Sequence, residues 1–104
     1  EETGVIPNAG EMIDLTKTFF KGKWDCIYPS PGACDELIKL FLYRQKSSEA
    51  EVKKMQGRKT GVAAENEHLK LRIVRLEELC RITPDVKAHC AYMMYTMLKK
   101  EGVI

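Results

Sequence analysis

Apolar side chains recur along most of the chain at steps of three and four residues, the spacing that places them on one face of an α-helix. This pattern predicts five helices, over residues 9–21, 31–45, 48–57, 60–81 and 84–101. No segment shows the β-branched alternation with a period of two that is typical of a strand. The expected fold class is therefore all-α, a compact bundle of about five helices.

Residues at the expected helix ends support these boundaries. Ser48 and Glu51 have the spacing of a capping box, which predicts a helix start at that point. Thr83 followed by Pro84 is typical of an N-cap and a first helical position, so the last helix is expected to begin there. Residues 24–32 hold two prolines and a glycine, which predicts a loop between the first two helices.

The composition is that of one globular domain. The 104 residues are 44% hydrophobic and 31% charged, within the ordinary range of folded proteins. A chain of this length buries roughly two thirds of its unfolded surface around one core. Residues 1–104 are thus expected to form a single helical domain.

The charge pattern argues against a nucleic-acid partner. The 17 basic and 15 acidic side chains leave a net charge of +2 and are mixed along the chain. The densest basic stretch, residues 53–59, has no aromatic neighbour on which a base could stack. No apolar run approaches the roughly 18 to 20 residues of a membrane span, so none is predicted.

Four cysteines flank two of the expected helix junctions. Cys26 and Cys34 bracket the proline-rich loop, and Cys80 and Cys90 bracket the turn at Thr83. They are candidates for two disulfides that could staple the bundle, by roughly 2 to 3 kcal/mol each, in an extracellular protein. Three pairings are open, and the alternative is four reduced, partly buried thiols in a cytoplasmic protein.

The same cysteines do not predict a metal site or a catalytic thiol. Seven residues separate Cys26 from Cys34 and nine separate Cys80 from Cys90, whereas the paired ligands of a zinc knuckle are separated by two to four. His68 and His89 could act as bases, but nothing in the sequence places either beside a cysteine. There is also no phosphate-binding glycine loop or nucleophile elbow. We therefore expect no enzyme, no metal and no cofactor.

The segment from Val62 to Cys80 continues an apolar register that resembles a coiled coil, with Asn66 as its polar position. Apolar residues outside the register, such as Leu71 and Val74, favour instead a central helix covered on several sides. A homodimer through residues 62–80 stays open as the alternative.

Methionine and aromatic side chains form a further cluster that could face an apolar ligand or a protein partner. Such residues usually fill a core, but they also line adaptable binding surfaces. The candidate surface consists of Phe19, Phe20, Phe41, Tyr92, Met93, Met94 and Met97.

Two stretches resemble a known family. Residues 80–85 and 90–92, with Glu2 to Val5, are similar to segments of insect odorant-binding proteins, which are secreted helical carriers of small apolar ligands. The resemblance implies a disulfide-bonded helical carrier. The predicted function is a non-enzymatic, secreted helical protein that binds an apolar small molecule or a protein partner. The alternative is an intracellular or viral helical adaptor that self-associates through residues 62–80.

Overall fold

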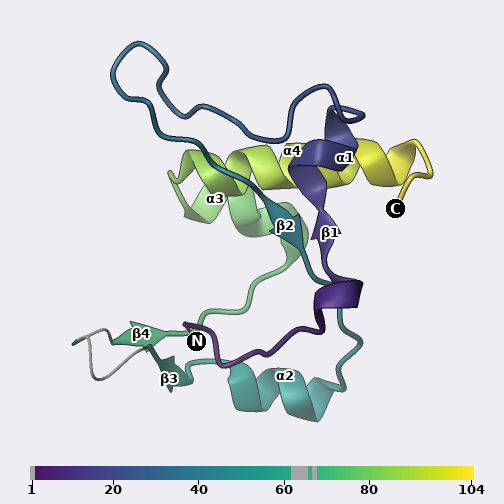
Figure 1. The fold of residues 1–104 in the computed structure, drawn as a ribbon. Helices are drawn as coiled ribbons and strands as arrows, with labels where there is room; N and C mark the ends of the chain where they lie inside the picture. The colour runs from purple at the N-terminus through teal and green to yellow at the C-terminus, as the bar shows by residue number, and fades with distance from the viewer. Residues whose placement is uncertain (1, 62–65, 67) are drawn as a thin grey trace. The chain divides into compact units, whose positions relative to one another are not determined.

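The computed structural model, which describes residues 2–61, 66 and 68–104, contains both helices and sheets (Figure 1). The described part has four α-helices and two small antiparallel sheets. Contacts within the chain divide it into two compact units: unit 1 comprises Glu1–Glu11 and Arg44–Val74, and unit 2 comprises Met12–Tyr43 and Arg75–Ile104. The prediction of an all-α bundle of five helices was therefore wrong.

Unit 2 is built around its longest helix, α4. Its elements in chain order are β1 (Ile13–Asp14), α1 (Leu15–Phe19), β2 (Phe41–Leu42), the short 3-10 turn η3 (Leu76–Glu78), α3 (Leu79–Ile82) and α4 (Val86–Lys100). Strands β1 and β2 pair antiparallel, with Ile13 opposite Leu42. A long segment without α-helix joins α1 to β2 (Figure 1). Within this segment, Ile27 and Ile38 form an isolated antiparallel β-bridge.

The core of unit 2 lies where α1 packs against α4. Leu15, Met94 and Leu98 are its buried hydrophobic members, with at most 3% of their surface exposed. Half-buried side chains surround these three: Phe19, Phe20, Ile27, Leu40, Leu42, Ala91 and Ile104.

A buried threonine joins α1 to the segment before β2. Thr16 is fully buried, and its Oγ1 accepts a hydrogen bond from the Leu40 N–H at 2.7 Å. The same hydroxyl lies 3.4 Å from the Leu40 carbonyl, to which it donates, and the Leu15 N–H donates to that carbonyl at 2.9 Å. Because both polar groups of Leu40 are satisfied in this way, the segment can lie against the core without a full sheet.

Unit 1 contains η1 (Ala9–Glu11), α2 (Glu49–Met55), β3 (Lys59–Thr60) and β4 (Leu69–Lys70). Strands β3 and β4 pair antiparallel, and the Leu71 N–H donates to the Arg58 carbonyl at 2.8 Å just beyond them. The side-chain amide of Gln56 binds both backbone groups of Ile73, at 2.7 and 2.9 Å. This pairing holds the chain after β4 against the end of α2.

One predicted helix is shortened to five residues, and another is absent because its apolar residues fit extended chain better. Of the helix predicted over residues 9–21, only α1 is α-helical. Over residues 31–45, Ile38, Leu40 and Leu42 are half-buried while Lys39 and Phe41 are exposed. This alternation is that of extended chain, and the structure has β2 and the Ile27 bridge there.

The helix predicted over residues 60–81 is also absent from the described residues of that range, apart from α3 at its end. Leu69, Leu71 and Ile73 alternate with basic residues, which is a strand pattern that the helical propensity of their neighbours masked. Asn66 has a φ of 56°, in the left-handed region. Residues 62–65 and 67 of the proposed coiled-coil segment lie outside the described residues, and the rest form no continuous helix.

Two helix predictions are confirmed. Ser48 is the N-cap of α2 and accepts a hydrogen bond from the Glu51 N–H at 3.2 Å. The last helix is α4, although its N-cap is Asp85 rather than Thr83, because the helix begins at Val86 and the Asp85 carboxylate accepts from the Lys87 N–H. Among the described residues, no helix has the length and apolar character to cross a membrane, in agreement with the prediction. Whether residues 1–104 behave as a single domain stays a prediction.

Candidate functional site

The four cysteines are free thiols, so the predicted disulfides were wrong. Cys34 is exposed, whereas Cys26, Cys80 and Cys90 are half-buried. The structure brings Cys26 and Cys90, one from each predicted pair, to the same pocket. Without disulfides, the case for an oxidising, extracellular compartment no longer holds.

A pocket on unit 2 is lined by both Cys26 and Cys90. We call it the aromatic pocket; its volume is about 550 Å³, and it is lined by Phe20, Trp24, Cys26, Ile27, Tyr28, Pro31 and Cys90. The loop after α1 supplies six of these residues, and α4 supplies Cys90. None of the seven carries a formal charge at neutral pH. About half of the Trp24 and Tyr28 surfaces remains exposed, at 52% and 50%.

Polar contacts organise one side of the aromatic pocket. The neighbouring Cys26 side chain, through hydrogen bonding first and electrostatic interaction second, raises the pKa of Tyr28. Next to Cys26, the Asp25 carboxylate lies 3.1 Å from the Lys39 ammonium. This hydrogen-bonded pair lowers the pKa of Asp25 and raises the pKa of Lys39. Because both side chains are exposed, this ion pair contributes little to the stability of the fold, and its main effect is to hold the two opposite charges together at the loop.

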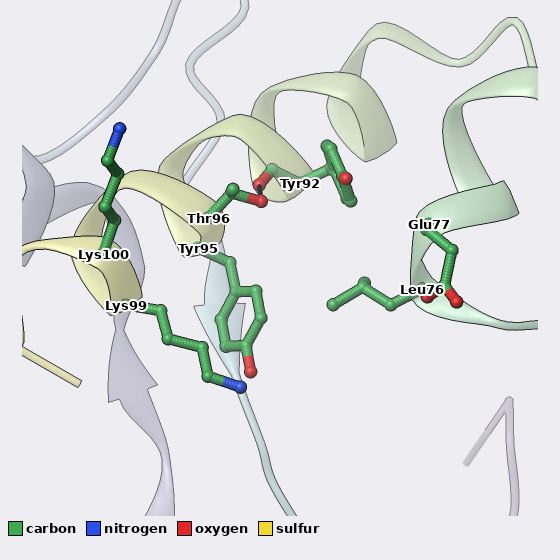
Figure 2. A pocket seen from close by; sticks show the side chains of 7 residues that line it. All are labelled: Leu76, Glu77, Tyr92, Tyr95, Thr96, Lys99 and Lys100. Atoms are coloured by element: carbon green, nitrogen blue, oxygen red, sulfur yellow. Dashed lines mark hydrogen bonds between the residues drawn. The ribbon is translucent and has the colours of Figure 1, made fainter.

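The second pocket lies between η3 and the C-terminal half of α4 (Figure 2). We call it the tyrosine–lysine pocket; its volume is about 360 Å³, and it is lined by Leu76, Glu77, Tyr92, Tyr95, Thr96, Lys99 and Lys100. The Lys99 ammonium lies 5.6 Å from the centre of the Tyr95 ring, within the range of a cation–π interaction. Figure 2 shows Lys100 extending in another direction, and the Thr96 hydroxyl donating to the Tyr92 carbonyl at 2.7 Å.

The chemistry of the tyrosine–lysine pocket differs from that of the aromatic pocket. Its lining residues include two lysines and two tyrosines, beside the single acidic residue Glu77. Such a set can attract an anion and donate hydrogen bonds to it. The part of the chain that the structure describes contains no group of three or more His, Cys, Asp or Glu side chains arranged to hold a metal ion.

The predicted apolar surface is divided between several places. Met94 belongs to the buried core, and Phe19 and Phe20 pack against that core. The rings of Phe19 and Phe20 meet edge to face, with their centres 5.3 Å apart. Phe20 also lines the aromatic pocket, and Tyr92 lines the tyrosine–lysine pocket. Phe41, Met93 and Met97 are exposed, at 53%, 40% and 43%. The seven residues therefore do not form one surface, and a binding role for them stays a prediction.

Sequence reasoning named Phe20, Cys26, Cys90 and Tyr92 but missed the other residues that line the two pockets. Trp24, Tyr28 and Pro31 fall in the segment that was correctly predicted as a loop. The concentration of aromatic and proline side chains in this loop could have indicated a binding site. Lys99 was hidden among ordinary exposed charges, since its neighbour Tyr95 becomes relevant only through the helical turn between them.

Comparison with known proteins identifies one relative of interest. The chain is 35% identical over all of its 104 residues to "Nudix hydrolase 14, chloroplastic" from Arabidopsis thaliana. No protein-family model matches the chain. No solved structure matches it either.

This likeness corrects the functional predictions. The relative is a hydrolase, which overturns the predictions of a non-enzymatic binding protein and of no enzyme, and nothing found points to insect odorant-binding proteins. The adaptor alternative fails as well, because residues 66 and 69–70 are not helical. The chain corresponds to 34% of the relative's length, so it spans about a third of the protein that it matches.

Proposed function

We propose that this chain acts in a hydrolase of the Nudix kind, on a nucleoside diphosphate derivative, and that it supplies the part corresponding to the matched third of the relative. The observation that carries the proposal is the identity of 35% along the whole chain. Since the relative is a chloroplastic protein, we also propose an intracellular, plastid location, in place of the predicted secretion.

The tyrosine–lysine pocket supports a phosphate-bearing substrate. Lys99 and Lys100 are both among its lining residues, and the positive charge of Lys99, whose ammonium lies near the Tyr95 ring, is opposite to that of a phosphate group. The hydroxyls of Tyr92 and Tyr95 add donors that a phosphate oxygen can accept from. These groups suit binding of an anion more than they suit activation of water.

A chimera tests the proposal directly. The 104 residues would replace the matched segment of Nudix hydrolase 14, and hydrolysis of nucleoside diphosphate derivatives that the relative itself cleaves would be measured. Because the matched segment is expected to fold and act as its counterpart does, we expect the chimera to keep activity within roughly a hundredfold, a loss of about 2.7 kcal/mol of transition-state stabilisation.

Two controls accompany this experiment. A chimera with a glycine–serine segment of equal length should be inactive, which shows that the matched third is needed. Circular dichroism and a melting curve establish that the test chimera is folded. A folded chimera without hydrolysis of any such substrate would refute the proposed function.

A further inference from the structure

We propose that the aromatic pocket binds the planar aromatic ring of a ligand, with a nucleobase as the class that fits it. The proposal rests on the proposed function, because a nucleoside diphosphate derivative brings such a ring. The pocket is distinct from the tyrosine–lysine pocket, and no residue lines both.

The surface that the pocket offers is flat and apolar. Phe20, Trp24 and Tyr28 contribute three aromatic rings, and Pro31 contributes a fourth flat face. Half of the Trp24 and Tyr28 surfaces is open to the pocket side or to solvent, although burial of such rings is favourable. Stacking of a planar ring on an aromatic side chain uses this exposed area and does not depend on a particular base.

Because the lining is uncharged, it favours the base of a nucleotide over the phosphate groups. None of the seven lining residues is charged at neutral pH, so nothing there compensates the desolvation of a phosphate. A neutral ring, by contrast, loses little solvation free energy when it enters the pocket. The volume of about 550 Å³ lies within the ordinary range of small-molecule sites and admits a bicyclic base.

The polar groups of the pocket suit a heterocycle better than an aliphatic chain. The Tyr28 hydroxyl and the Cys26 thiol belong to side chains of the lining. A few polar groups in an apolar pocket orient a ligand that has heteroatoms at its edge. The ring nitrogens of a base provide such heteroatoms, whereas a fatty chain has none.

The chain carries its own reporters of binding. Trp24 is the only tryptophan, so the tryptophan fluorescence of the 104-residue protein comes from this pocket. Cys26 and Cys90 line the pocket, whereas Cys34 and Cys80 do not. The rates at which iodoacetamide alkylates these thiols, resolved by peptide mass spectrometry, therefore contain an internal control.

The probe is adenosine, which has the ring and lacks phosphate. We expect it to quench Trp24 saturably and to slow the alkylation of Cys26 and Cys90, with unchanged rates at Cys34 and Cys80. The variant Tyr28→Ala should weaken binding roughly tenfold, since one stacking face is lost. The variant Phe41→Ala removes an exposed ring of unit 2 outside the pocket and should bind as the unchanged protein does.

Three results would overturn the inference: no quenching or protection up to the solubility of adenosine, equal protection of all four thiols, or equally strong binding of cyclohexanol, which is apolar but not planar. Circular dichroism of Tyr28→Ala separates lost stacking from lost folding, and these three results are all measured on the unchanged protein. Because adenosine contains no bond for the proposed hydrolase to cleave, binding here and hydrolysis by the chimera fail independently.

Discussion

Thr16 is the one buried polar side chain of the described residues, and its place is explained by hydrogen bonding alone. Its hydroxyl accepts from the Leu40 N–H and donates to the Leu40 carbonyl. These are the two hydrogen bonds that a backbone peptide group of a neighbouring strand would otherwise make with Leu40. An unpaired N–H at this position would be buried against the core, which is far more costly than an exposed one.

The variant Thr16→Val keeps the size of the side chain and removes this bond. We expect the free energy of unfolding, measured with urea, to fall by about 1 to 3 kcal/mol, because the Leu40 N–H loses its partner. Thr18→Val is the matched control: Thr18 lies in the same helix, and its hydroxyl makes no hydrogen bond with any described residue. An equal loss in both variants would show that the effect comes from helix propensity instead.

At the scale of elements, the sequence predicts those whose ends are marked by local chemistry. The caps of α2 and α4 involve side chains within three residues of the bond that they make, so Ser48 and the Thr83–Asp85 stretch indicate them. Strand β2 depends on Ile13 and Leu15, more than 20 residues away in the chain, and no local signal reports that pairing. Apolar periodicity then favours a helix that tertiary contacts do not allow.

The same limit applies to the candidate site. The loop that bears Trp24 and Tyr28 is predictable from its prolines and glycine, but its meeting with Cys90 depends on the packing of α1 against α4. The cysteines were noticed for their spacing, whereas the structure pairs them across the fold rather than along the chain.

The cap of α4 should make the stability of this helix sensitive to acid. The hydrogen bond from the Lys87 N–H at 2.9 Å, then the Lys87 side chain, lowers the pKa of Asp85 below its usual range. A carboxyl group whose pKa is lower in the folded than in the unfolded state stabilises the fold above its ordinary pKa. That contribution is lost as the pH falls through the lowered folded value.

The variant Asp85→Asn keeps a capping side chain and removes the charge. We expect its melting temperature to lie below that of the unchanged protein at neutral pH, and the difference to close in acid. Asp35→Asn removes the same charge from an exposed position outside any helix and should show no such pH-dependent difference. A difference for Asp85→Asn that stays constant down to roughly pH 2 would contradict the role of the ionised cap.

At the scale of the molecule, unit 2 depends on a small core. Leu15, Met94 and Leu98 are its buried hydrophobic residues, and two of the three lie on α4. Losing one of them removes a large share of a stability that is typically about 5 to 15 kcal/mol for a domain.

We expect Leu98→Ala to lower the free energy of unfolding by about 2 to 5 kcal/mol, through the cavity that it leaves. If residues 1–104 are a single cooperative domain, amide exchange should accelerate together at Ile38 in unit 2 and at Leu71 in unit 1, both of which donate backbone hydrogen bonds. Met97→Ala, on the exposed side of the same helix, is the control and should change little. Unaltered exchange at Leu71 would show that the two units unfold separately.

The packing of α1 on α4 also has a consequence for the order in which the chain can fold. Leu15 enters the ribosomal exit tunnel long before Met94 and Leu98 are joined to the chain, yet these three residues make one core. Until α4 has been synthesised, Leu15 has no buried partner, and residues 44–74 must close as a loop before unit 2 is complete. Folding of unit 2 is thus a late event, and a nascent chain that stops before α4 leaves its apolar side chains open to chaperones and to aggregation.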